Sequence, residues 1–224
     1  MTVRLINHMG SDLTVVNAAR VSFDKESEWE AIPFGGVLEG NLSEKDEKLI
    51  GYLARHNHWT PFGHCFAQFR IEAPVFVARQ LMKHQVGLVW NEISRRYVDY
   101  DPDFWTPLVW RGRADNKKQG SSEEPVDKQE SIQHVYADAV RHARDAYNFL
   151  LKSGVCAEQA RAVLPQSMNT EWYWSGSLAA FARVCRLRMS SDAQKETKDI
   201  ATDIHRKMVR LFPVSWRALC GTCY

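Results

Sequence analysis

The sequence predicts an α+β protein in which helices dominate the second half of the chain. Residues 65–72 alternate between apolar and polar side chains, which is the pattern of a strand covered on one face. Several segments after residue 130 place apolar side chains three and four positions apart, as amphipathic helices do. Hydrophobic residues at 45% and charged residues at 25% are typical of a packed globular chain.

The length of 224 residues favours a single domain over residues 1–224, because such a chain can bury one sizeable core without disulfides or metal ions. The formal charge is only +2 at pH 7. No apolar stretch approaches the roughly 20 residues of a membrane span. The five cysteines follow no regular spacing, which suits free thiols in a reducing compartment. We therefore expect a cytoplasmic protein without a membrane partner.

In the first half we expect a helix, a loop, a strand and a second helix, in that order. The helix at 43–56 begins with the capping residue Ser43. The strand at 65–72 leads to Pro74, which suits the first turn of a helix that meets no breaking residue before Gly87.

The middle of the chain is more polar. Residues 88–100 are too polar for a core strand and too rich in aromatic and β-branched residues for a plain linker, which indicates a functional segment. Residues 112–129 have almost no apolar side chains and predict a mobile polar insertion at the surface. Beyond them we expect four helices, at about residues 132–154, 157–164, 177–187 and 192–211.

The densest polar cluster lies within residues 83–97. It holds Lys83, His84, Glu92, Ser94, Arg95 and Arg96. An arginine fork next to a hydroxyl suits a phosphate group, and a solvated charged loop is the alternative. In the predicted helix at 177–187 and just after it, Arg183, Arg186 and Arg188 lie among apolar residues, so at least one of them needs either a ligand anion or a route to solvent.

Metal binding is the weaker interpretation of two patterns. His56 and His58 lie two residues apart, but Cys65 is the nearest further ligand. Cys220 and Cys223 form one CxxC, which is half of a zinc site or a redox pair at most. We therefore predict no metal site.

Six segments together resemble the flavin-dependent thymidylate synthase (ThyX) family and occur in that family's order. They are NAARVSF at 17–23, HWTPFGH at 58–64, APVFVARQLMKHQ at 73–85, NEISRRY at 91–97, ARAVLP at 160–165 and LRMSSDAQKE at 187–196. The combination of NExSxRY, VARQxM, TPFxH and ARxVLP is specific, and the likeness covers most of the chain outside the 112–129 insertion.

The resemblance implies a ThyX-like fold, with an antiparallel or mixed central sheet and helices packed around it. It also implies a homotetramer that binds FAD between subunits. Such an enzyme transfers a one-carbon unit from 5,10-methylenetetrahydrofolate to carbon 5 of dUMP, with reduction from NADPH. The implied small-molecule partners are dUMP and folate, and nucleic acid is not expected.

Matching the motifs residue by residue implies two sets of site residues. The nucleotide set is Gln80, Glu92, Ser94, Arg95, Arg96, Arg161 and Arg188. The flavin set is Ser22, His58, Lys83, His84, Gln85, Asn91 and Arg183. The catalytic group within the first set is Arg161, Arg188 and Ser94. The arginines suit the charge that builds on the uracil ring, whereas Ser94 is implied as a phosphate contact because the motif places no base beside it.

The sequence departs from the family pattern on the flavin side. The family has RHR and four further residues before NE, whereas this chain has Lys83, His84 and Gln85 followed by the five residues VGLVW. Gln supplies neither the charge nor the fork of Arg. Gly63 stands where glutamate is usual, and Arg183 stands where Asn or His often faces the flavin. We predict that Arg183 replaces one lost charge.

Three alternatives remain beside the dUMP methyltransferase. The first is a related enzyme that methylates or hydroxymethylates carbon 5 of another pyrimidine nucleotide. The second is a protein that binds nucleic acid through its basic and aromatic side chains near residue 97, although a net charge of +2 gives little long-range attraction. The third is an inactive family member that serves as a subunit for an active partner.

Overall fold

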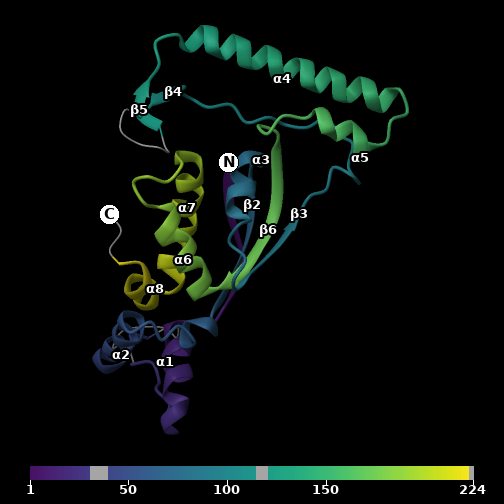
Figure 1. The fold of residues 1–224 in the computed structure, drawn as a ribbon. Coiled ribbons are helices and arrows are strands. Elements are labelled where there is room, and N and C mark those ends of the chain that lie inside the picture. The colour runs from purple at the N-terminus through teal and green to yellow at the C-terminus, as the bar shows by residue number, and fades with distance from the viewer. Residues whose placement is uncertain (31–39, 115–120, 222–224) are drawn as a thin grey trace.

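The structure, a computed structural model, describes residues 1–30, 40–114 and 121–221 (Figure 1). Its centre is a four-stranded sheet in the order β1-β2-β6-β3, in which all neighbouring strands are antiparallel. The strands are β1 (Thr2–Met9), β2 (Phe66–Pro74), β3 (Leu88–Glu92) and β6 (Asn169–Ser177). This arrangement confirms the α+β class and the antiparallel sheet.

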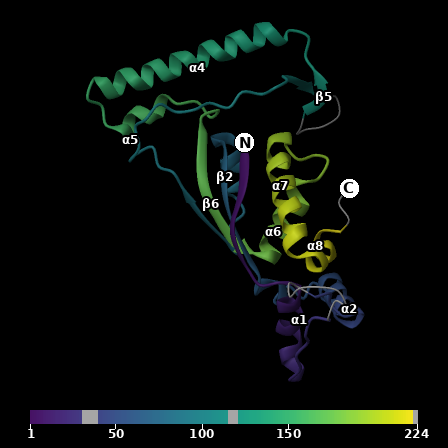
Figure 2. The same cartoon turned by 180° about the vertical axis from the view of Figure 1, so that it is seen from behind.

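Helices surround this sheet on one side and at both ends (Figures 1 and 2). Alongside it lie α3 (Val75–Leu81), α6 (Leu178–Arg188), α7 (Lys195–Leu211) and α8 (Pro213–Cys220). At one end lie α1 (Asp12–Arg20), η1 (Val21–Phe23), α2 (Glu44–Arg55) and η2 (Pro61–Gly63). At the other end lie α4 (Gln129–Lys152), α5 (Ala157–Ala160), η3 (Arg161–Val163) and a ribbon of β4 (Arg111–Arg113) and β5 (Ser121–Pro125). No helix within the described ranges is long and apolar enough to cross a bilayer.

The core forms where the sheet packs against α6. Alternate residues of β2 and β6 point inward, and Phe69 and Trp174 are fully buried. Phe181 of α6 meets both rings edge-on, at centroid distances of 5.1 Å and 5.4 Å. This packing fixes α6, and therefore the arginines at its end, relative to the sheet.

Two strand ends lead directly into helices. Pro74 ends β2 and precedes α3. Ser177 ends β6, and its side chain accepts a hydrogen bond from the backbone N–H of Ala180 at 3.2 Å, which caps α6. Earlier in the chain, a tight turn at Gly87, where φ is +74°, follows α3 and leads into β3, which pairs with β6.

Several predicted elements are confirmed. The helix at 43–56 is α2, and the Ser43 hydroxyl accepts a hydrogen bond from the Asp46 N–H at 3.2 Å. The strand at 65–72 is β2, with Ala67, Phe69 and Ile71 buried as its alternation requires. The four later helices correspond to α4, α5 with η3, α6 and α7.

Other expectations are corrected. The helix after Pro74 ends at Leu81 instead of continuing toward Gly87. Residues 88–92 form a strand, which tolerates polar residues because it lies at the edge of the sheet with much of its length in contact with solvent. The surface insertion expected at 112–129 stays a prediction: its two arms include residues of the paired strands β4 and β5, and residues 115–120 lie outside the described residues. The sequence analysis also missed β1, α1, β6 and α8.

Candidate active site

A cavity of about 550 Å³ lies where α3, α6 and the start of α7 meet the β4–β5 ribbon. Its lining includes Gln80 and Arg188, two members of the predicted nucleotide set. The Gln80 side-chain oxygen accepts a hydrogen bond from the Thr197 hydroxyl, which is fully buried on α7. Gln80 is thus fixed by a neighbouring helix before any ligand binds.

Arg188 is held at the end of α6 by two residues of the α3 region. Its Nε donates a hydrogen bond to His84 Nε2 at 2.9 Å, and its Nη2 donates to the Gln80 carbonyl at 3.5 Å. Burial lowers the pKa of the His84 imidazole, and the charges of Arg188 and Arg183 lower it further. Burial also lowers the pKa of Arg188. The structure therefore joins a residue of the predicted nucleotide set to one of the predicted flavin set.

The β4–β5 ribbon is attached to this cavity by an ion pair. Arg111 Nη2 lies 2.5 Å from Glu196 Oε1, and both side chains are largely buried, at 17% and 11% exposure. Gln194 donates a second hydrogen bond to the same carboxylate at 3.1 Å. Sequence reasoning missed Arg111 and Glu196, since 85 residues separate them and neither has a recognisable local pattern.

The loop after β3 presents a second group of predicted nucleotide residues. The Arg96 N–H and Nε lie 3.4 Å and 3.5 Å from the Ser94 hydroxyl. Arg96 is exposed, and its guanidinium lies over the Tyr97 ring at 5.1 Å. Glu92, at the end of β3, accepts a hydrogen bond from the Thr170 hydroxyl at 2.6 Å. The hydroxyl and the guanidinium are therefore adjacent, and both are donors of the kind that an anion accepts from.

Arg95 and Arg161 occupy different settings. Arg95 is 7% exposed, donates to the Tyr100 carbonyl at 2.5 Å and lies 4.4 Å from the centre of the Tyr100 ring. It holds the loop and lines a small polar cavity of about 230 Å³. Arg161, on η3, is exposed and donates to the Glu158 carbonyl at 3.2 Å.

The predicted flavin residues lie in three places. Ser22 and His58 line a cavity of about 600 Å³ between α1, η1 and α2. His58 also borders a second cavity of about 250 Å³, together with Arg183 and Arg186. Arg183 donates to the Val86 carbonyl at 2.6 Å.

The remaining members of the flavin set follow α3. His84 contacts Arg188 as described above. Lys83, Gln85 and Asn91 have exposed side chains. Within the part of the chain that the structure describes, the cavity beside Arg188 shares no lining residue with the cavity beside Ser22 or with the one that Arg95 lines.

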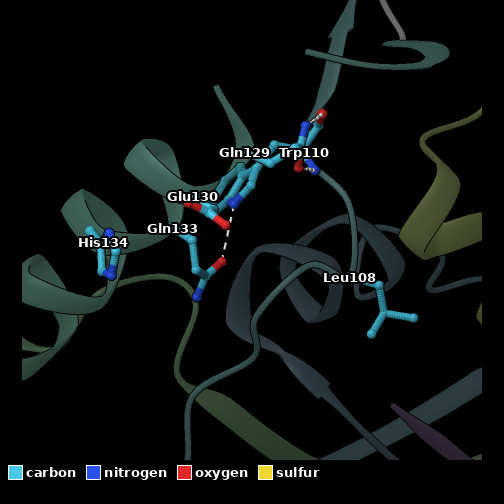
Figure 3. A pocket seen from close by; sticks show the side chains of 6 residues that line it. All are labelled: Leu108, Trp110, Gln129, Glu130, Gln133 and His134. Carbon is cyan, nitrogen blue, oxygen red and sulfur yellow. Dashed lines mark hydrogen bonds between the residues drawn. The ribbon is translucent and has the colours of Figure 1, made fainter. Parts of the chain in front are cut away.

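A further cavity, of about 490 Å³, was not anticipated from the sequence. It lies between the start of α4 and the loop that precedes β4 (Figure 3). The Trp110 indole donates to Gln133 at 3.1 Å, and its backbone N–H donates to Gln129 at 2.9 Å. These bonds fasten the loop to α4.

Known proteins resemble this chain over most of its length. The family model described as "Thymidylate synthase complementing protein" matches residues 4–214. The flavin-dependent thymidylate synthase of Thermus thermophilus is 36% identical over 217 residues, which cover 96% of this chain and 74% of the relative. The enzyme of the same name from Kosmotoga olearia is 34% identical over 224 residues, which cover 99% of this chain and 91% of the relative.

Solved structures with the same fold include a UMP/dUMP methylase, PolB from Streptomyces cacaoi. Its complex with 5-Br UMP superimposes with a TM-score of 0.81 at 28% identity, over 98% of this chain and 93% of that one. Its complex with 5-Br dUMP gives a TM-score of 0.82 at 28% identity, over 97% and 93%. With most of its length matched by the family model and by these relatives, the chain belongs to the flavin-dependent thymidylate synthase family.

Proposed function

We propose that this protein is a flavin-dependent thymidylate synthase that transfers a one-carbon unit from 5,10-methylenetetrahydrofolate to carbon 5 of dUMP. The observation that carries the proposal is the fixed guanidinium of Arg188, held by His84 and the Gln80 carbonyl at the wall of a cavity of about 550 Å³. Carbon 5 of uracil becomes nucleophilic only when negative charge can build on the ring oxygen and nitrogen atoms. A guanidinium that is already oriented and partly desolvated stabilises that charge where it develops.

Ser94 and Arg96 are proposed to bind the nucleotide phosphate. A hydroxyl and a guanidinium 3.5 Å apart offer several donors to one anion, and Arg161 adds an exposed guanidinium on another element. Gln80 is proposed to contact the nucleotide beside Arg188. Among the described residues, the cavity that Gln80 and Arg188 line shares no residue with the cavity beside the Ser94 loop, so we propose that a second subunit completes the site.

A homotetramer with sites between subunits meets this requirement. Large apolar side chains on α4 and on segments that carry predicted site residues are strongly exposed in the single chain, which is typical of surfaces that other subunits cover. They include Phe23 at 76%, Val89 at 69%, Tyr97 at 78%, Val135 at 72% and Phe149 at 69%. Two of them, Phe23 and Tyr97, lie next to Ser22 and Arg96.

The chain also has groups that fit FAD. Ser22 and His58 line a cavity of about 600 Å³, and Arg183 and Arg186 supply two cations at the adjoining cavity. The diphosphate of FAD requires such donors. The aromatic rings of FAD can stack on Trp59, which lines the same cavity and is 62% exposed. When bound, FAD supplies the redox chemistry by which electrons from NADPH reduce the transferred carbon to a methyl group.

Release of tritium from carbon 5 of labelled dUMP tests the proposal directly. Purified protein is incubated with FAD, NADPH and methylenetetrahydrofolate, and the nucleotide product is identified by mass. We expect tritium release and dTMP in wild-type protein and in an Arg206→Ala control, whose guanidinium is exposed on α7. A protein that binds FAD and dUMP yet releases no tritium would contradict the proposed reaction.

UMP deserves a parallel assay, because the similar solved structures are those of a UMP/dUMP methylase. The same incubation with UMP measures the preference for the sugar. Mass analysis separates a methylated product from a hydroxymethylated one, so it distinguishes the related reactions in a single experiment.

Nucleic-acid binding finds less support. The rings of Tyr97 and Tyr100 are already covered on one face by Arg96 and Arg95, at 5.1 Å and 4.4 Å. Stacking with bases would have to displace these contacts. RNA retention by a colourless protein that takes up no flavin would favour this alternative over the enzyme. Activity that appears only after addition of a second protein would favour the inactive subunit.

A further inference from the structure

We propose that His84 is a positioning residue for Arg188, and that protonation of its imidazole releases the guanidinium and switches the site off at acidic pH. The kinetic part of this inference rests on the proposed function. The contact itself does not, because it is a property of the protein without ligands.

The geometry fixes the chemical state of the imidazole. The Nε of an arginine carries a hydrogen atom and cannot accept one, so its partner at 2.9 Å must offer a lone pair. His84 Nε2 is therefore unprotonated, and the ring is neutral with its hydrogen on Nδ1. A protonated ring would place two N–H groups and two positive charges against each other.

The surroundings favour the neutral ring. Arg188 and Arg183, both on α6, are the charged groups that act on the imidazole, and Lys83 is its exposed neighbour in the chain. Within the described residues no carboxylate contributes to the titration of His84. Burial and the two arginines hold its pKa below the ordinary value for histidine. The contact with Arg188 is thus present at neutral pH and is lost as the pH falls through this lowered pKa.

The expected consequence is a loss of kcat larger than any rise in KM. Arg188 acts on charge that develops in the transition state, so a displaced guanidinium reduces stabilisation of that state more than binding of the ground state. Below the pKa of His84 the neutral fraction falls about tenfold per pH unit. The acid limb of the kcat profile is therefore expected to approach this slope.

Two substitutions separate the positioning role from a merely structural one. In His84→Gln the amide oxygen replaces the Nε2 acceptor but does not titrate, so the acid limb of kcat is expected to flatten. In His84→Leu a side chain of similar volume offers no acceptor, and kcat is expected to be low at every pH. Following kcat from pH 7.5 down to the lowest pH at which each variant stays folded, relative to its own value at pH 7.5, removes any difference in flavin content that does not depend on pH.

A flattened acid limb in His84→Gln but not in wild type supports the inference. The same limb in both proteins would overturn it, since it would then come from the nucleotide phosphate or from another group. Equal kcat for His84→Leu and His84→Gln at pH 7.5 would also overturn it.

A second measurement is independent of turnover. Long-range ¹H–¹⁵N spectra of ¹⁵N-histidine protein report the tautomer and pKa of each of the eight histidines, and the signal missing from His84→Gln identifies His84. We expect the Nδ1–H form at pH 7.5 and a pKa below that of free histidine. An Nε2–H tautomer or an ordinary pKa would refute the contact. A protein that makes no dTMP but shows the expected His84 signal would refute only the proposed function.

Discussion

Asp46 is expected to be the main electrostatic contact between α1 and α2, and Asp46→Asn measures its contribution. The carboxylate is 2% exposed and accepts hydrogen bonds from Arg20 Nε at 3.0 Å and Nη2 at 2.5 Å, from the Ser27 hydroxyl at 3.1 Å and from the Ser43 hydroxyl at 2.8 Å. A hydrogen bond to a charged group contributes about 1.5–3 kcal/mol. Because Arg20 is 25% exposed and regains some hydration, we expect a net loss of about 2–4 kcal/mol in the free energy of unfolding.

Glu44→Gln is the matched control. Glu44 also lies in the first turn of α2, so both substitutions remove one negative charge from the same helix terminus. Its ion pair with Lys48, at 2.6 Å, is 83% and 72% exposed, and such surface pairs contribute about 0–1 kcal/mol. Urea unfolding followed by far-ultraviolet circular dichroism, at equal protein concentrations, gives both values. If Asp46→Asn and Glu44→Gln lost equal free energies of unfolding, Asp46 would not be the main electrostatic contact between α1 and α2.

The pH dependence of stability supplies a further check. Burial by itself raises the pKa of Asp46, but hydrogen bonds from Arg20, Ser43 and Ser27 outweigh it and leave the pKa below the ordinary aspartate value. A lowered pKa in the folded state contributes stability above the unfolded pKa of about 3.9 and loses it as the pH falls toward the folded value. The wild-type protein should therefore lose this contribution below about pH 4, and the Asn variant should lack it at every pH.

Three further substitutions test other parts of the structure. Arg183→Ala should weaken FAD binding about tenfold in a fluorescence titration, because a cation is lost from the cavity of about 250 Å³; unchanged affinity would remove its proposed role. Arg188→Ala should reduce kcat by about 100-fold or more while dUMP still binds in calorimetry, and near-normal turnover would contradict its catalytic role. Gly176→Ala should cost about 1–3 kcal/mol in denaturant unfolding, because the new Cβ would lie 2.4 Å from Leu88 Cδ2. Gly63→Ala, whose Cβ would meet its nearest side-chain atom at 3.5 Å, is the control and should cost less.

The sequence predicted the helices and strands whose signals, such as a capping residue or an alternating pattern, lie within a few residues of each other. The Ser43 cap and the alternation along β2 lie within a few residues, so α2 and β2 could be recognised in the sequence. The strand β3 could not be recognised in the same way. Its polar composition is acceptable only because it is an edge strand, and it becomes an edge strand by pairing with the distant strand β6. The strand β6 itself alternates buried Trp172 and Trp174 with more exposed residues, a signal that was present in the sequence but overlooked.

The site was predictable residue by residue but not as an arrangement. The family motifs single out both His84 and Arg188, yet they assign them to different ligands. Their contact spans 104 residues and depends on where α3 and α6 end. The Arg111–Glu196 pair likewise depends on how the β4–β5 ribbon lies against α7. Contacts of this kind follow from the three-dimensional packing, which no short motif contains.

The end of α3 also supplies a partner that stabilises the partly buried guanidinium of Arg188. The last carbonyls of a helix have no partner within the helix and carry partial negative charge. Arg188 donates to one of them, the carbonyl of Gln80, and it also lies in the last turn of its own helix, α6. The C-terminus of α3 therefore faces the cation. The Gln80 carbonyl dipole and a neutral His84 hold the guanidinium in place, and neither contact cancels its charge, which suits its proposed role beside an electron-rich ring.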